Sequence, residues 1–280
     1  MQLGRPVKWT ATRSEGYQST THGRDHIQYV EMAATSDGKI TGVRSVVYAG
    51  IGAYLSTAGP GVPTILHGLM YSGTYDIGAT RADIYGVFNN ATPVDAYRGA
   101  GRPEATFLVE RLVDLLAVEL GTDPVDLRRK NLIPKFEDGH DVVCGLTYDS
   151  GDYEMILDKV LEHVDYKALR EEQAAAREHG SYMGIGVCTY AEICGLGPSQ
   201  VAGAVGFGGG LWESAIVRFP PTGKVNVYSG ISPRGPGDKT TFDRIISDAL
   251  ARHTNTLSQV PGETTHTPLD TITPRHGTQG

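Results

Sequence analysis

The sequence predicts an α+β protein made of two mixed units, each with a β-hairpin and packed helices. The chain has 280 residues, which suits about two domains at roughly 150 residues each. Two pairs of strand-like runs flank turn sequences, and amphipathic helical patterns lie between the pairs. Hydrophobic residues make up 40% and charged residues 20%, so the chain lies outside the range of disordered sequences.

Two hairpins are expected from turn signals. Within residues 29–48, Asp37-Gly38 separates two β-rich runs, and this dipeptide favours a type I′ turn, which needs positive φ. Residues 212–219 and 224–228 repeat the plan around the turn sequence 220–223, with alternating side chains along the first run. Each hairpin leads into a glycine-rich stretch and a candidate helix, which hints at two related units without establishing a repeat.

Four helices are predicted between the hairpins. The clearest begins at Pro103 and carries leucines at helical spacing until Gly121 supplies a C-cap. A second covers about 123–130, with acidic residues at its start and basic residues at its end. A third, Tyr153–Val164, has one apolar stripe, and a charged fourth covers about 167–178.

The domain boundary is expected in a linker over residues 134–151. Residues 1–140 and 141–250 then form two partial units. Residues 251–280 are rich in Thr, Gly, Pro and His and poor in large aliphatic side chains, which predicts an irregular tail. That tail is either disordered or an interrupted piece of a larger fold.

Charge and cysteine content exclude several classes. Lys plus Arg total 25 against 32 for Asp plus Glu, a net charge of -7, so no nucleic-acid partner is expected. No apolar run is long enough for a membrane span, and the start of the sequence lacks a signal-peptide pattern. The 3 cysteines are an odd number in a large chain, which favours reduced thiols and a cytoplasmic location.

Three short constellations carry little chemical signal. His22 and His26 share a four-residue spacing but lie in a loop-like or strand-like context, so two solvated histidines are expected. Cys188 and Cys194 match no common zinc or redox spacing, so they are expected to be buried structural thiols. Residues 206–210 are glycine-dense without a following helix pattern, which indicates a flexible loop.

The segment just before Pro103 carries a stronger chemical signal than these three. Gly99 and Gly101 would let backbone N–H groups approach a ligand, Arg98 and Arg102 could each grip an oxyanion with paired donors, and a helix N-terminus follows. This combination suits an anion cradle. Spacing alone supports equally well a plain turn that starts a helix, with both arginines paired to surface carboxylates.

Several stretches resemble one protein family in the order in which they occur. The most specific is Ala96–Arg102; the others are Gly4–Trp9, Thr21–Asp25, Leu127–Ile133, Leu146–Tyr153, Trp212–Ser214 and Pro221–Val225. Together they resemble the large subunit of molybdenum hydroxylases, the xanthine dehydrogenase and aerobic carbon monoxide dehydrogenase family. The resemblance covers nearly everything from Leu3 to about Leu250, as an internal segment of such a subunit.

In that family the large subunit binds molybdenum through a molybdopterin dinucleotide, usually the cytosine form in bacteria, and electrons leave through an iron–sulfur small subunit and a flavin medium subunit. The resemblance therefore implies a hetero-oligomeric oxidoreductase that hydroxylates a small molecule with oxygen from water. It also implies that two units share one cofactor site, in a fold incomplete at both ends. It places the following residues in the first cofactor loop: Tyr97, Arg98, Gly99, Ala100, Gly101 and Arg102.

The loop type bears on the substrate. Members that oxidise carbon monoxide carry a copper-binding cysteine at the position that matches Gly99, and glycine offers no ligand. Carbon monoxide is therefore not expected as the substrate. The glycine-bearing loop resembles that of members that act on aldehydes or N-heterocycles, and the sequence does not choose between these.

The second cofactor loop departs from the family pattern. The resemblance assigns Gly235, Gly237, Thr240 and Thr241 to it, but Pro236 replaces a glutamine and has no N–H to donate. The family's glutamate base is expected beyond Gly280, so no catalytic residue or metal ligand is assigned here and the isolated chain is expected to be inactive. The alternative is a noncatalytic remnant or scaffold that keeps the fold and the partner surface.

Overall fold

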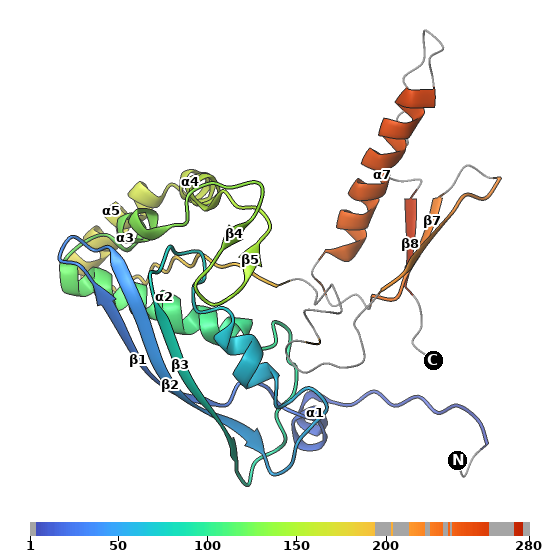
Figure 1. Cartoon of the computed structure of the whole chain (residues 1–280), viewed down its shortest axis with the longest axis horizontal. Coiled ribbons are helices and arrows are strands. Elements are labelled where there is room, and N and C mark those ends of the chain that lie inside the picture. The colour runs from blue at the N-terminus through green and yellow to red at the C-terminus, as the bar shows by residue number, and fades with distance from the viewer. Residues whose placement is uncertain are drawn as a thin grey trace. The chain divides into compact units, whose positions relative to one another are not determined.

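A computed structural model describes residues 4–193, 203, 213–221, 225–231, 235, 237–257 and 272–276. The chain forms two compact units, Met1–Cys194 and Gly195–Gly280, shown in Figure 1. The division between these two packed units follows Cys194. The sequence predicted a domain boundary earlier, in the linker over residues 134–151.

The first unit contains a three-stranded sheet with the order β1-β2-β3. β1 (His26–Ala34) and β2 (Ile40–Gly52) pair in antiparallel register, with Tyr29 opposite Val46. The connecting turn contains Gly38 at a φ of 89°, so the first predicted hairpin is confirmed. β3 (Thr80–Phe88) adds in parallel to β2, after a crossover that includes the short η1 helix (Val62–Leu66).

The core of the first unit lies between this sheet and α2 (Arg102–Leu120), which runs across one face of the sheet in Figure 1. The predicted helix is confirmed, and Gly121 ends it at a φ of 61°. Leu108, Val109 and Val113 are buried, whereas Leu115 is 48% exposed. The face of the helix that packs on the sheet thus consists of leucines and valines, and it does not include every leucine of the predicted stripe.

Three further predicted helices are confirmed, and each begins at an aspartate. They are α3 (Pro124–Asn131), α4 (Tyr153–Val164) and α5 (Tyr166–Glu178), and the side chains of Asp123, Asp152 and Asp165 accept backbone N–H groups at their starts.

The expected linker contains a small hairpin of β4 (His140–Asp141) and β5 (Thr147–Tyr148). The Tyr148 hydroxyl donates to Gly73 O at 2.8 Å, and Leu157 of α4 joins the core. These contacts hold residues 141–193 on the first unit.

The second unit pairs β6 (Ala215–Arg218) with β7 (Val225–Ser229) in antiparallel register, so the second hairpin is confirmed. α7 (Asp238–Leu257) contributes Ile246 and Leu250 to a small core with Val225 and Val227. β8 (Ile272–His276) pairs in parallel with β7.

The prediction of an irregular tail over 251–280 is therefore wrong at two places. Residues 251–257 continue α7, and residues 272–276 form β8. The free edge of β7 supplies backbone hydrogen-bond partners for β8, and composition does not reveal such a partner. Among the described helices, none combines the length and the apolarity needed to cross a bilayer.

Candidate functional site

The predicted anion cradle forms a tight loop that ends at the N-terminus of α2. Gly99, Ala100 and Gly101 have φ values of 102°, 46° and 90°, a left-handed run that glycine adopts readily and alanine adopts at a cost. Ala100 N donates to Tyr97 O at 2.7 Å, and Arg102 N donates to Gly99 O at 3.3 Å. Hydrogen bonds within the loop therefore hold its backbone without any contribution from a ligand.

Both glycines are also required by packing within the protein. A Cβ on Gly99 would lie 2.4 Å from Pro103 Cγ, and one on Gly101 would lie 2.3 Å from Val62 O. The loop thus lies directly against the start of α2 and against η1. Neither position accepts a side chain without movement of the neighbouring atoms.

Arg102 points inward. It is 7% exposed, and its guanidinium donates to Ala100 O at 3.0 Å and to Ile193 O at 3.4 Å. Its Nε lies 3.6 Å from Glu192 Oε1. Arg102 therefore fastens the loop to the segment around residue 193, whereas Arg98 and Tyr97 lie exposed on the loop.

Arg24 fastens the loop from its other side. Its guanidinium donates to Arg98 O and stacks over the Tyr97 ring at 4.6 Å. Its Nε lies 3.7 Å from Oε2 of Glu104, a first-turn residue of α2 that is 8% exposed. The charge on Arg24 is thus largely compensated by Glu104.

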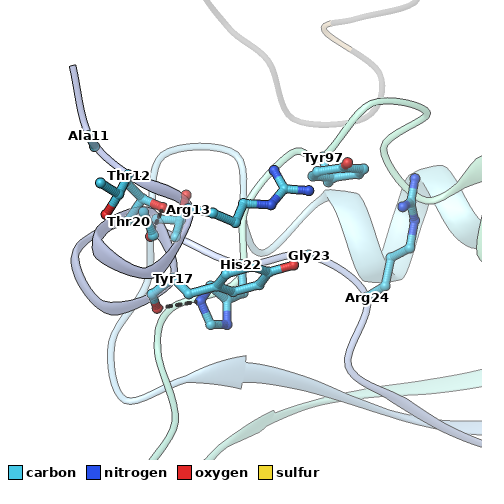
Figure 2. A pocket seen from close by; sticks show the side chains of 11 residues that line it. Ala11, Thr12, Arg13, Tyr17, Thr20, His22, Gly23, Arg24 and Tyr97 are labelled. Carbon is cyan, nitrogen blue, oxygen red and sulfur yellow. Dashed lines mark hydrogen bonds between the residues drawn. The ribbon is translucent and has the colours of Figure 1, made fainter.

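A pocket of about 600 Å³ opens beside Tyr97. Figure 2 shows Arg13 reaching from α1 (Arg13–Ser19) toward Tyr97, with Arg24 on the other side of that ring. α1 begins with a capping box, in which Thr12 and Glu15 bond to each other's backbone N–H groups. The spacing Thr12-x-x-Glu15 is the sequence signal that indicates such a helix start.

Two histidines lie beneath the loop. His67 is fully buried, and burial, assisted by the neighbouring His26, lowers the pKa of His67 to about 3. The Tyr71 hydroxyl contacts His67 Nε2 at 2.9 Å and accepts a hydrogen bond from Ser45 Oγ at 2.7 Å. Neutral His67 therefore accepts a hydrogen bond at Nε2 from the Tyr71 hydroxyl.

The expectation of two solvated histidines is wrong for His26. His22 is exposed, but His26 is half-buried and packs edge-to-face on His67 with ring centroids 4.8 Å apart. Burial lowers the pKa of His26 as well. The strand β1 alternates between a covered and an open face, and His26 belongs to the covered face.

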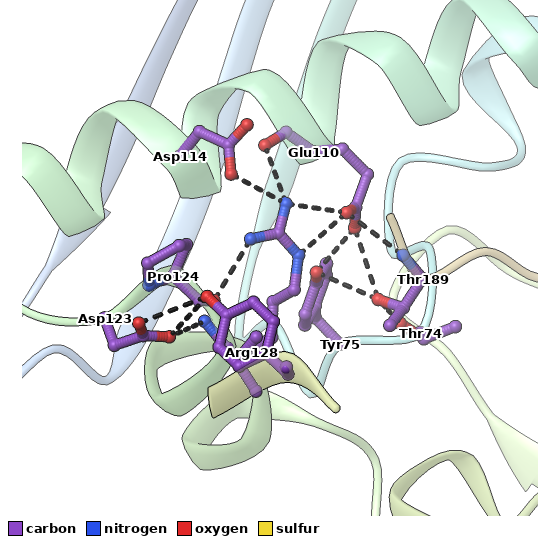
Figure 3. Close-up of polar contacts among 10 residues, drawn as sticks. Thr74, Tyr75, Glu110, Asp114, Asp123, Pro124, Arg128 and Thr189 are labelled. Atoms are coloured by element: carbon purple, nitrogen blue, oxygen red, sulfur yellow. Dashed lines mark hydrogen bonds and ion pairs between the residues drawn. The ribbon is translucent and has the colours of Figure 1, made fainter. Parts of the chain in front are cut away.

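We call residues 186–193 the strap, because they run along α2 to the contacts of Arg102. In Figure 3 Thr189 N donates to Glu110 Oε2, at 3.1 Å, and Thr189 Oγ1 contacts Tyr75 and Glu110. Arg128, fully buried, contacts Glu110 Oε2 and Asp114 Oδ1 at 2.9 Å each. One buried network thus joins α2, α3 and the strap.

The cysteine expectation is corrected in part. Cys188 is exposed on the strap, because an extended segment places alternate side chains on opposite sides. Partial burial, together with the charge of Glu110, raises the pKa of its thiol to about 11, so the protonated form dominates near neutral pH. Cys144 is half-buried and also unpaired, and Cys194 lies outside the described residues.

The second predicted loop leads into α7 of the second unit. Gly235 and Gly237 have φ values of 88° and 94°, and Thr240 and Thr241 lie exposed in the first turn of α7. Thr241 N donates to Gly237 O at 3.0 Å. Pro236 lies outside the described residues, as does the glycine-dense stretch 206–210.

No group of three or more His, Cys, Asp or Glu side chains within the described part of the chain could hold a metal ion. The loop offers guanidinium and backbone groups instead, which suit anionic and carbonyl-bearing ligands. Such a donor set fits the anionic oxygens of an organic cofactor. The residues that sequence reasoning missed are those that fasten the loop from elsewhere: Arg24, His67 and Glu192.

Comparisons with known proteins agree on one family. Molybdopterin cofactor-binding domain models match residues 1–132 and 159–274. The carbon monoxide dehydrogenase large chain of Hydrogenophaga pseudoflava is 40% identical over 273 residues, 95% of this chain and 34% of that protein. The nicotine 6-hydroxylase large subunit of Paenarthrobacter nicotinovorans is 30% identical over 269 residues, 94% of this chain and 32% of that protein.

Solved structures give the same result. Quinoline 2-oxidoreductase from Pseudomonas putida 86 superposes with a TM-score of 0.78 at 29% identity, covering 99% of this chain and 33% of that chain. Carbon monoxide dehydrogenase from Oligotropha carboxidovorans superposes with a TM-score of 0.75 at 32% identity, with the same coverages. The chain thus spans about a third of the length of its curated relatives. It belongs to the molybdopterin-binding large subunits of the molybdenum hydroxylases, the family of xanthine dehydrogenase and carbon monoxide dehydrogenase.

Proposed function

We propose that this chain is part of a molybdenum-dependent oxidoreductase that hydroxylates an aldehyde or an N-heterocycle, with water as the oxygen source. The observation that carries the proposal is the loop of Tyr97–Arg102, which turns through a left-handed run at Gly99–Gly101 just before α2. Two similar proteins are named for N-heterocycles, a nicotine 6-hydroxylase and a quinoline 2-oxidoreductase.

The residues present fit a molybdopterin dinucleotide, which we propose to be the cytosine form. Exposed Arg98 would bind anionic oxygens of the cofactor, while Arg102 keeps the loop carbonyls in place from inside. In the second unit the exposed start of α7 would contribute Gly235, Gly237, Thr240 and Thr241. When bound, the cofactor supplies the redox-active metal for hydroxylation.

Its partners, on this proposal, are an iron–sulfur subunit and a flavin subunit, in a cytoplasmic hetero-oligomer. Electrons taken from the substrate need such carriers to leave the site. Because the chain spans about a third of its relatives, we expect the 280 residues alone to be inactive.

Gly99 argues against carbon monoxide as the substrate. Its φ is 102°, and a Cβ would lie 2.4 Å from Pro103 Cγ, so this backbone does not accommodate the cysteine that copper binding needs. We expect Gly99→Cys in the assembled enzyme to produce neither copper binding nor carbon monoxide oxidation. A gain of either, measured by metal analysis and by an oxidation assay, would refute this interpretation of the loop.

Arg98→Ala in the complete large subunit, expressed with its partners under molybdate-sufficient conditions, tests the proposal. Loss of charge-assisted hydrogen bonds worth about 1.5–3 kcal/mol each should lower molybdenum occupancy or turnover about tenfold or more. Arg44→Ala is the control, because Arg44 is an exposed arginine on β2 that pairs with Glu31. Unchanged metal content and rate in Arg98→Ala would contradict the assignment.

A noncatalytic scaffold is the second candidate, and Pro236 favours it. Proline there removes both a glutamine amide and a backbone N–H from the second loop. Molybdenum analysis of the folded wild-type subunit distinguishes the two functions. Stoichiometric metal supports the oxidoreductase, and a folded subunit without metal or pterin supports the scaffold.

A further inference from the structure

The pocket beside Tyr97 has the size and lining of a binding site for a small organic molecule. Its volume of about 600 Å³ lies within the range of small-molecule pockets. Arginine, histidine, threonine and tyrosine side chains line it, and no aspartate or glutamate does. The lining therefore favours a ligand with negative charge.

Arg13 supplies the free charge of this pocket. Its guanidinium forms no ion pair with a carboxylate of the described residues and lies 5.6 Å from the centre of the Tyr17 ring. Arg24, on the far side of Tyr97, is already engaged by Glu104 and by Arg98 O. The pocket thus offers one uncompensated guanidinium, which matches a monoanion better than a polyphosphate.

Aromatic rings form the walls around Arg13. Tyr17 and Tyr97 are 60% and 58% exposed, so each ring keeps surface that a ligand can reach beside the guanidinium that covers part of it, Arg13 over Tyr17 and Arg24 over Tyr97. Tyr17 is steadied by His22, whose ring lies edge-to-face at 5.6 Å and whose Nε2 is 2.9 Å from Tyr17 O. A planar ring between these walls would gain stacking contacts that an aliphatic acid would not. Figure 2 shows the guanidinium of Arg13 on the side facing Tyr97.

We propose that this pocket binds an aromatic or heteroaromatic carboxylate, with the carboxylate on Arg13 and the ring against Tyr17 and Tyr97. Bidentate pairing of guanidinium with carboxylate fixes the orientation of the acid. Because Tyr97 also begins the loop of the proposed cofactor site, the acid is the substrate class of the enzyme. That last step rests on the proposed function, whereas binding itself does not.

The test compares two ligands that differ only in charge. The chain is titrated with nicotinate and with nicotinamide, and binding is followed by calorimetry or by perturbation of tyrosine signals. Nicotinate should bind about tenfold or more tightly, and Arg13→Ala should remove this preference. Arg13→Lys should keep part of it, since the charge remains and the bidentate geometry is lost. Arg44→Ala, an exposed arginine outside the pocket, is the matched control.

Several outcomes would overturn the proposal. Equal binding of the two ligands, or a preference that survives in Arg13→Ala, would show that Arg13 does not select the acid. Tighter binding of inorganic pyrophosphate, abolished by Arg13→Ala, would replace the carboxylate with a phosphate ligand. If Arg13→Ala does not fold, Tyr17→Leu must weaken nicotinate through loss of the ring wall. None of these measurements requires molybdenum, so their failure is distinct from failure of the Arg98→Ala test.

Discussion

The buried network around Arg128 gives a sharp prediction for stability. Arg128 is fully buried, and Arg128→Met keeps much of its volume but leaves Glu110, which is 7% exposed, without its cation. Breaking a buried ion pair from one side costs about 3–5 kcal/mol. Glu110 keeps donors from Tyr75 and Thr189, and the Asp114 side chain is 36% exposed and can rehydrate. We therefore expect a loss of about 3 kcal/mol in the free energy of unfolding.

Urea unfolding followed by circular dichroism measures this loss, with Glu110→Gln as the reciprocal variant. Glu110→Gln should cost less, about 1–2 kcal/mol, because Arg128 keeps Asp114 at 2.9 Å and Pro124 O at 3.1 Å. The double variant should be more stable than Arg128→Met, since it leaves no buried charge unpaired. A loss below about 1 kcal/mol for Arg128→Met, or a double variant no more stable than it, would refute the reasoning.

Three more outcomes are expected. Gly121→Ala should lower the free energy of unfolding by about 1 kcal/mol because of the positive φ at this position. Gly101→Ala should lower it clearly more, because backbone atoms occupy the place of the added Cβ. Equal losses in urea unfolding would contradict this. Folding lowers the pKa of His67 from 6.5 to about 3, so between those pH values only the unfolded state binds the proton. The free energy of unfolding should therefore drop by up to about 1.4 kcal/mol per pH unit as the pH falls below 6.5. His67→Gln should flatten that slope, and an unchanged slope argues against a buried neutral imidazole. Glu192→Gln should speed amide hydrogen exchange in the strap, because it removes the ion pair with Arg102. The Tm should change little, since the Glu192 side chain is 34% exposed. Unaltered exchange rates would show that the pair does not hold the strap.

The elements that were predictable from sequence are those with local signals. α2 has Pro103 in its first turn and Gly121 directly after its last residue, and its leucines follow helical spacing. The turn at Asp37-Gly38 forms the predicted hairpin, but positive φ falls on Gly38 and not on Asp37, so it is not the type I′ turn that the dipeptide favours. Each of these signals acts within a few residues of the element that it defines, so tertiary context is not needed to recognise it.

The parts that were missed depend on partners far along the chain. β3 pairs in parallel with β2, and parallel pairing needs a crossover that no turn motif announces. Tyr148 returns to Gly73, which carries the segment after residue 140 onto the first unit. Local composition carries no record of such long-range contacts, so the division in packing after Cys194 was not predictable from it.

Long-range contacts also explain why the two arginines of the loop, Arg98 and Arg102, differ in burial. Spacing gave Arg98 and Arg102 one role, because a sequence shows only that both flank the glycines. The structure separates them, since Arg102 meets Ile193 and Glu192 from the strap and becomes a buried tie, while Arg98 stays exposed. On our proposal, the charge that buried Arg102 does not offer to a ligand comes instead from another element, from Arg13 on α1, whose guanidinium has no carboxylate partner among the described residues. Charge near the loop is therefore set by which cations the surrounding chain neutralises, and that is decided by packing.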